Sequence, residues 1–273
     1  MGFACPTTLS EGALAARLAR LRAAGRPALI PYITAGFPTP ADTTLFLRGA
    51  AAAGADVVEL GVPWSDPVAD GPTIQASTHA ALAGGMTPAR TLELLAGARP
   101  DLPVVVFTYV NPVLARGAAE FAAAAGRAGA AGLLVTDLPA GADETVERDL
   151  LSAGLPLVRL VAPTTPPARR REIAERSGGF LYLIARLGVT GESARLSNVL
   201  GAQVASLRAV TDLPIAVGFG ISSPQQAAEV AGFADGVVIG SAVVSRMARG
   251  GAAEALDWLR TVRAALDARR GSA

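Results

Sequence analysis

The strongest constraint on the fold is a regular alternation between short apolar segments and longer segments with helical spacing. Eight segments rich in Val, Ile and Leu recur from one end of the chain to the other. Near-continuous apolar runs of this length are typical of parallel strands that are buried on both faces. The predicted strands are Ala28–Thr34, Asp56–Leu60, Pro103–Thr108, Gly132–Thr136, Pro156–Val161, Phe180–Ala185, Pro214–Val217 and Asp235–Ile239.

Helix signals lie between these strands. Proline is favoured at the first position of a helix, and it stands at four of the expected starts: Pro40, Pro72, Pro88 and Pro224. Leucines at helical spacing between Leu14 and Leu21 predict an extra helix before the first strand, which we expect to cover the bottom of a barrel. A short helix should begin at Ser241, and the last helix should run from about Ala252 to Ala268.

The pattern predicts an α/β protein with one (βα)₈ TIM barrel. The chain has 273 residues, and such a barrel needs about 250. A doubly wound sheet would carry G-x-G-x-x-G after its first strand, and the segment Thr34–Pro38 lacks that motif. We therefore expect a single barrel domain over residues 1–273, with a flexible tail over residues 1–9.

Missing residue types narrow the chemistry. The chain has no lysine, because all 24 of its basic residues are arginine. Schiff-base aldolase chemistry and covalent attachment of pyridoxal phosphate both require a lysine amine, so this chain can perform neither. Cys5 and His79 are the only residues of their types, which argues against a disulfide, a zinc site or a Ser-His-Asp triad. We expect His79 on a helix surface and no metal or cofactor.

Charge and hydropathy indicate a cytoplasmic protein that binds neither nucleic acid nor a membrane. The formal net charge is +1, and the densest basic run, Arg169 to Arg171, is expected on an exposed helix. No charge-free apolar run reaches the ~18 residues that a membrane span needs. The segment Met1–Ser10 does not have the composition of a signal peptide.

Two acidic residues stand where barrel enzymes carry their chemistry, after the second predicted strand. Glu59 lies between Val58 and Leu60, and a carboxylate there is costly to bury without a role or a partner. Asp70 lies in a long loop that precedes the helix at Pro72. The alternatives are an ion pair for Glu59 with an arginine and a helix N-cap for Asp70.

Glycines follow three late strands and predict a phosphate site. They lie in the segments 188–191 and 218–222 and at Gly240, which precedes Ser241. Glycine lets backbone N–H groups approach an anion, and a helix N-terminus favours negative charge. In TIM barrels the loops after strands 7 and 8 commonly hold phosphate. These features predict a small phosphorylated substrate that is processed by carboxylate acid–base catalysis.

Four motifs closely resemble those of the tryptophan synthase alpha subunit family, and the resemblance extends from about Leu14 to Ala265. The motifs are Glu59-Leu60-Gly61-Val62-Pro63, Ser65-Asp66-Pro67-Val68-Ala69-Asp70-Gly71-Pro72-Thr73-Ile74-Gln75, Gly188-Val189-Thr190-Gly191 and Gly218-Phe219-Gly220-Ile221-Ser222. The resemblance implies a lyase of tryptophan biosynthesis that cleaves indole-3-glycerol phosphate into indole and glyceraldehyde 3-phosphate.

The resemblance also implies roles for residues at matching positions. Glu59 would be the proton shuttle and Asp70 the acceptor of the indole N–H. Tyr182 would hydrogen-bond near Glu59, and Thr190 would orient Asp70 as its loop closes. The remaining matches are the indole pocket Tyr32, Phe107, Leu134 and Phe219, the phosphate-binding residues Gly191, Gly220, Gly240 and Ser241, and the partner contacts Pro63, Asp66 and Asn111. Tyr109 matches a position near the pocket wall.

The implied partner is a tryptophan synthase beta subunit in an alpha–beta heterotetramer. A stand-alone lyase that releases free indole is the alternative. A non-catalytic barrel would require the loss of Glu59 or Asp70, and an isomerase-like barrel does not carry the motif from Asp66 to Gln75. Departures from the family pattern fall in or near loops that contact the partner: Phe37, Trp64, Ala185 and Arg186.

Overall fold

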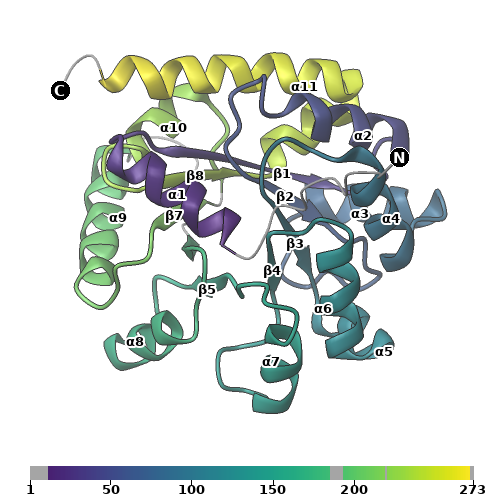
Figure 1. Cartoon of the computed structure of the whole chain (residues 1–273). Coiled ribbons are helices and arrows are strands. Elements are labelled where there is room, and N and C mark those ends of the chain that lie inside the picture. Colours follow the sequence, from purple (N-terminus) through teal and green to yellow (C-terminus); the bar gives the residue numbers. More distant parts are fainter. Residues whose placement is uncertain (1–11, 185–192, 219, 271–273) are drawn as a thin grey trace, which may run out of the picture.

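The structure is a computed structural model, and it describes residues 12–184, 193–218 and 220–270. Eight parallel strands form one sheet in the order β4-β3-β2-β1-β8-β7-β6-β5, and helices surround it as a TIM barrel (Figure 1). The strands are β1 Ala28–Thr34, β2 Val58–Gly61, β3 Val104–Thr108, β4 Gly132–Val135, β5 Arg159–Val161, β6 Leu181–Ile184, β7 Ile215–Gly218 and β8 Gly236–Ile239. The predicted fold class is confirmed.

The described helices lie between and around the strands. They are α1 Ala13–Ala23, α2 Pro40–Gly49, α3 Pro72–Ala83, α4 Pro88–Ala98, α5 Val110–Arg116, α6 Ala118–Arg127, α7 Glu144–Leu151, α8 Pro167–Glu175, α9 Ser193–Arg208, α10 Pro224–Val230 and α11 Ser241–Arg270. None of the helices in the described ranges is long and apolar enough to cross a membrane.

The predicted helix starts are confirmed, and side-chain caps explain three of them. Thr39, Thr87 and Ser223 each accept a hydrogen bond from a backbone N–H in the first turn, and proline follows each of them. A side-chain oxygen at the N-cap satisfies an N–H group that has no partner inside the helix. All eight predicted strands are also present, with ends displaced by up to three residues.

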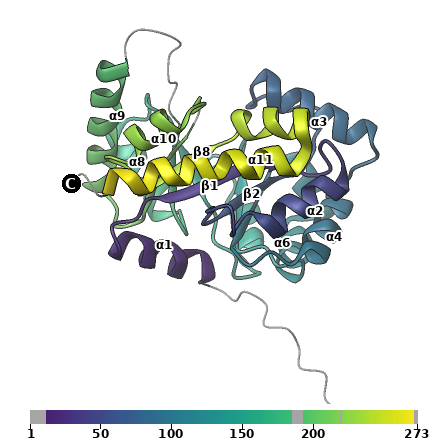
Figure 2. The same cartoon turned by 90° about the horizontal axis from the view of Figure 1, so that it is seen from above.

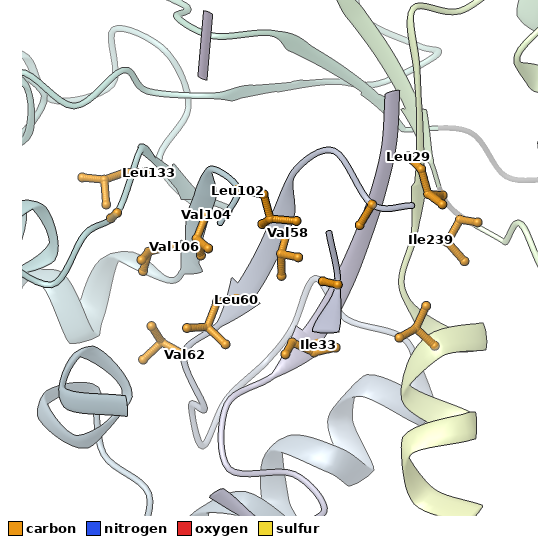
Figure 3. Packing of buried hydrophobic residues seen from close by; sticks show 14 of the residues in the cluster. Leu29, Ile33, Val58, Leu60, Val62, Leu102, Val104, Val106, Leu133 and Ile239 are labelled. Carbon is orange, nitrogen blue, oxygen red and sulfur yellow. The ribbon is translucent and has the colours of Figure 1, made fainter. Parts of the chain in front are cut away.

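The main core lies between the strands and the surrounding helices. Side chains alternate along each strand, so Leu29, Val58 and Val104 point outward into this layer (Figure 3). The next residues, such as Ile30 and Val105, belong to a second cluster inside the barrel. Both clusters consist of buried residues, so the polar residues at the strand ends stand on a packed core.

Helix α1 closes the bottom of the barrel, as its leucine spacing predicts. Leu14 and Leu18 are buried in the interior cluster together with Phe180. An ionic cluster reinforces this end: Arg17 of α1 and Arg26 both contact Asp56, which lies just before β2. The extra helix is therefore part of the barrel.

Helix α11 has two parts, which the sequence predicts as separate helices. The backbone leaves the helical region at Gly250 and Gly251, and Gly251 has a φ of 64°. Only glycine adopts such a conformation without strain. The first part, from Ser241, follows β8 directly, and the second part lies against β1, α2 and α10 (Figure 2).

Of the two surface predictions, the one for His79 is confirmed and the one for the arginine run is only partly right. His79 is exposed on α3, as expected. The arginine run on α8 is less exposed than predicted, because Arg169 donates to the carbonyl oxygen of Ala140 and Arg170 to that of Thr165. Only Arg171 of the run is fully on the solvent side. The run serves to tie α8 to neighbouring loops.

Candidate active site

A cavity opens at the carboxyl ends of the strands, with about 740 Å³ of empty space. Its walls come from every part of the barrel mouth, so it lies over the barrel axis. The lining residues are Tyr32, Glu59, Ala69, Asp70, Gly71, Ile74, Phe107, Thr136, Leu160, Tyr182, Ile184, Gly220, Val238, Gly240 and Ser241. The structure thus brings together the two predicted acids and Tyr182.

Glu59 lies on β2, next to Tyr32 in the parallel register, and only 1% of its surface is exposed. Its Oε1 atom has no hydrogen-bond partner in the part of the chain that the structure describes. Burial disfavours the charged form and raises the pKa of the Glu59 carboxyl from 4.5 to about 8. The alternative of an ion pair with arginine is not found among the described residues.

Asp70 lies in the loop after β2, and a tyrosine holds its side chain. Tyr109, which follows β3, donates from its hydroxyl to Asp70 Oδ2 over 2.9 Å. The same hydroxyl accepts the backbone N–H of Ala69 over 3.1 Å. Burial raises the pKa of Asp70 to about 6, and the hydrogen bond from Tyr109 opposes that rise. The N-cap alternative is wrong, because Gly71 is the N-cap of α3 and no side chain caps that helix.

The two carboxyl groups therefore differ in protonation near neutral pH. Glu59 keeps its proton below about pH 8, whereas Asp70 loses its proton above about pH 6. Two acids whose environments separate their pKa values can take different catalytic roles, one as a proton donor and the other as an anion. The cavity places both roles within one site.

Aromatic side chains form much of the cavity wall. Tyr32 and Phe107 meet edge to face, with ring centroids 5.2 Å apart. Glycines make room for the tyrosines, because a Cβ at Gly61 would lie 2.1 Å from the Tyr32 hydroxyl and one at Gly218 would lie 2.6 Å from that of Tyr182. Burial raises the pKa of Tyr182, and nearby Glu59 and Asp70 raise it further.

Tyr182 lines the cavity together with Glu59, and no hydrogen bond joins the two side chains in the described part of the chain. One predicted cavity residue lies elsewhere. Leu134 is fully buried in the interior cluster and does not line the cavity. Thr136, two positions further along the chain and just past the end of β4, takes that place.

Several lining residues were missed in the sequence: Ile74, Thr136, Leu160, Ile184 and Val238. Period-two alternation could have found two of them. Thr136 follows Leu134 by two positions, so it continues the inward face of β4 just past its end, and Ile184 follows Tyr182 by two on the inward face of β6.

The predicted phosphate-binding residues that the structure describes lie on one side of the cavity. Gly220 follows β7, and Gly240 and Ser241 join β8 to α11. Gly220 has a φ of 91°, and the first part of α11 begins at Ser241. A helix N-terminus next to glycine backbone suits an anion. Thr190, Gly191 and Phe219 lie outside the described residues, as do Ala185 and Arg186.

The predicted partner contacts lie at the rim of the same barrel end. Asp66 and Asn111 are exposed, whereas Pro63 is buried. Val68, in the loop that carries Asp70, is 81% exposed. The loop after β2 therefore carries both a cavity residue and an exposed apolar side chain.

Comparison with known proteins supports the interpretation of the motifs. A family model described as "Tryptophan synthase alpha chain" matches residues 18–267. The tryptophan synthase alpha chain of Halorhodospira halophila is 45% identical over 262 residues, which cover 93% of this chain and 96% of the relative. That of Gloeobacter violaceus is 47% identical over 253 residues, which cover 92% of each.

Solved structures agree with these relatives. The crystal structure of tryptophan synthase subunit alpha from Legionella pneumophila has a TM-score of 0.85 and 34% sequence identity, over 93% of this chain and 98% of that one. A chain of tryptophan synthase from Mycobacterium tuberculosis, in its aminoacrylate-bound form, has a TM-score of 0.84 and 33% identity, over the same shares. The chain belongs to the tryptophan synthase alpha chain family, whose members are carbon–carbon lyases that cleave indole-3-glycerol phosphate.

Proposed function

We propose that Glu59 and Asp70 carry out the cleavage of indole-3-glycerol phosphate in this chain. The observation that supports this assignment most directly is the pair of buried carboxyl groups with separate pKa values at one cavity. The substrate needs no imine to accept the bond electrons, because its indole ring can take them up. This agrees with a chain that has no lysine.

The first step is protonation of indole C3 by Glu59. A carboxyl group with a pKa of about 8 is protonated at neutral pH and can donate that proton. Protonation converts the ring into an iminium form with positive charge at N1. Glu59 is left as a carboxylate with no charged partner among the described residues, so it is a strong base for the next step.

Asp70 stabilises the charge that develops on the ring. As a carboxylate it accepts the indole N1–H, and its negative charge faces the nitrogen that becomes positive. Tyr109 donates a hydrogen bond to Oδ2 of this carboxylate over 2.9 Å, so the other oxygen remains for the substrate. The hydrogen bond from Tyr109 thus orients Asp70 as well as favouring its charged form.

The second step breaks the carbon–carbon bond. Glu59 removes the proton from the hydroxyl on the carbon attached to C3, and that carbon becomes the aldehyde of glyceraldehyde 3-phosphate. The electrons of the broken bond return to the ring and neutralise N1. Indole keeps the proton at C3, and Glu59 ends protonated, ready for another turnover.

Gly220, Gly240 and Ser241 hold the phosphate in this proposal, and the aromatic wall holds the ring. The N-terminus of α11 attracts the phosphate charge. Tyr32 and Phe107 provide an apolar surface across the cavity. The substrate then spans the cavity from the glycines to the aromatic wall, with its reactive carbon near Glu59.

The proposed partner is a tryptophan synthase beta subunit that receives the indole. The related Mycobacterium tuberculosis chains come from crystal structures of tryptophan synthase. Exposed Asp66, Val68 and Asn111 lie at the same end of the barrel as the cavity mouth, where a partner would receive the product. In this proposal the partner carries the pyridoxal phosphate chemistry, because this chain has no lysine to hold that group.

The test is release of glyceraldehyde 3-phosphate from indole-3-glycerol phosphate, measured with a coupled dehydrogenase, with and without an added beta subunit. We expect cleavage in both cases, faster with the beta subunit, and co-elution of the two chains. No release above the enzyme-free background in either case contradicts the assignment. Full activity alone, with no co-elution, supports a stand-alone lyase instead.

A further inference from the structure

The barrel has a seam between β4 and β5, the two ends of the strand order. A single bridge joins them, between Leu133 and Leu157. Its backbone hydrogen bonds run from Leu133 N–H to the oxygen of Pro156 and from Val158 N–H to the oxygen of Leu133. Beyond this point, toward the carboxyl ends, the described residues show no further backbone bond between the two segments.

A second cavity lies at this unpaired part of the seam, with about 840 Å³ of empty space that is partly open to solvent. It is bounded by the ends of β4 and β5, by the loops that follow them and by α8. Helices α7 and α8 lie outside β4 and β5 in this region (Figure 1). The position suggests a side pocket through the barrel wall.

Thr136 and Leu160 line both this cavity and the active-site cavity. Continuing the register of Leu133 with Leu157 would pair Thr136 with Leu160, so the two residues face each other across the unpaired seam. Both are half-buried. They are the residues that the two cavities share.

The charged residues of the side cavity are already paired. Arg159 donates from Nη1 to the carbonyl oxygen of Leu138 and contacts Glu147 at 2.9 Å, while its Nε and Nη2 atoms have no hydrogen-bond partner in the described part of the chain. Arg169 donates to the carbonyl oxygen of Ala140 and contacts Glu172. With both guanidinium groups neutralised, the cavity suits a neutral group rather than an anion.

The proposed substrate position directs the benzene ring of indole toward this seam. The phosphate lies near Gly220, Gly240 and Ser241 after β7 and β8, and N1 lies near Asp70 after β2. In the strand order, β4 and β5 lie across the barrel from β8 and β1. The far edge of the ring therefore faces Phe107, Thr136 and Leu160.

We propose that the gap between Thr136 and Leu160 is a specificity site that admits a neutral substituent on the benzene ring of the indole into the side cavity. This inference rests on the proposed function, because it uses the substrate position argued there. It assigns ring-substituted indoles as an additional substrate class. Leu160 determines how large the substituent can be.

The experiment measures kcat/KM for synthesis from glyceraldehyde 3-phosphate and indoles that carry one methyl or one phenyl group at C4, C5, C6 or C7. At one ring position we expect turnover to be retained with both groups. At the positions that face closed walls, each group should lower kcat/KM by about tenfold or more. Leu160→Ala should raise the ratio of phenylindole to indole kcat/KM at the tolerated position by about tenfold or more.

Ile184→Ala is the matched control, because it removes the same number of carbon atoms from a wall of the active-site cavity that does not border the side cavity. For each variant, the rate on a substituted indole is divided by the rate of the same variant on unsubstituted indole. If Leu160→Ala does not fold, Thr136→Ala takes its place. Uniform loss at all ring positions in the wild type, or an equal gain with Ile184→Ala, overturns the inference. Absence of turnover with unsubstituted indole and with indole-3-glycerol phosphate instead contradicts the proposed function.

Discussion

Asp56 and Glu59 are three residues apart, Asp56 just before β2 and Glu59 within it, and both are buried to 1% exposure or less. Asp56 accepts hydrogen bonds from Arg17 at 2.7 Å, Arg26 at 2.6 Å and the backbone N–H of Leu29 at 3.0 Å. Arg263 lies 3.6 Å from its other oxygen. Glu59 Oε1 has no such partner among the described residues.

The difference separates a structural carboxylate from a reactive one. Burying a charge is costly unless it is paired and hydrogen-bonded, and the partners of Asp56 offset that cost at the bottom of the barrel. Glu59 is buried at the top, where barrels hold their active sites, and it meets the same cost by keeping its proton. Burial alone therefore does not distinguish the two roles; their hydrogen-bond partners do.

We expect the largest effect from Glu59→Gln, on the rate of cleavage. This variant keeps the shape of the side chain but cannot transfer a proton, so kcat for cleavage should fall by about 10²–10⁴-fold. The measurement is single-turnover release of indole, with circular dichroism to confirm the fold. Turnover near that of the wild type contradicts the role of Glu59 as the proton shuttle.

Asp56→Ala should instead affect stability. The change removes the contacts of Arg17 and Arg26 and leaves Arg263, which is 8% exposed, with Asp267 as its remaining carboxylate among the described residues. Breaking a buried ion pair from one side costs about 3–5 kcal/mol, which urea unfolding can measure. Asp56→Asn is the matched control, because it keeps the shape of the side chain and removes only its negative charge. A loss below about 1 kcal/mol shows that this cluster does not hold the barrel bottom.

The pH dependence of stability should differ between the wild type and Glu59→Gln. The carboxyl of Glu59 has a pKa of about 8 in the folded state and 4.5 when unperturbed. Between these values the folded state holds a proton that the unfolded state has lost, so this group makes stability fall as pH rises. The loss by pH 8 is up to about 4 kcal/mol.

In Glu59→Gln this contribution should be absent, so the stability curve of the variant should be flatter than that of the wild type from pH 5 to pH 8. The free energy of unfolding at several pH values measures the difference. Parallel curves for the two proteins mean that Glu59 titrates normally in the folded state.

Tyr109→Phe should have the smallest effect. The change removes the hydrogen bond that favours the charged form of Asp70, whose pKa is about 6. The lower limb of the profile of kcat/KM against pH should move to higher pH by about one to two units, since a hydrogen bond to a charged group contributes about 1.5–3 kcal/mol. Tyr32→Phe is the comparison, because its hydroxyl contacts Thr34 at 3.4 Å instead. An unmoved limb in Tyr109→Phe contradicts its effect on Asp70.

The barrel could be predicted from the sequence because its signals are local. Apolar runs mark each strand, and Pro40, Pro88 and Pro224 mark helix starts that the structure confirms. The division of α11 at Gly250 and Gly251 was also visible as two helices. Such features depend on a few neighbouring residues and on no distant contact.

The environments of the acids could not be predicted, because they depend on contacts between distant segments. Asp70 is held by Tyr109, which is 39 positions away, and not by its own helix as the capping alternative had it. Asp56 was predicted only as the start of a strand, although its partners Arg17 and Arg263 come from near the two ends of the chain. No sequence pattern marks which buried carboxylate receives arginines.

The most direct test of the account is the protonation state of Glu59 in the folded protein. Infrared difference spectra of the wild type minus Glu59→Gln, recorded from pH 4 to pH 10, isolate the carbonyl band of that one protonated carboxyl group. We predict that the band persists through neutral pH and disappears with a midpoint near pH 8. A band that disappears near pH 4.5 means that Glu59 is an ordinary ionised carboxylate, and the contrast with Asp56 then has no chemical consequence.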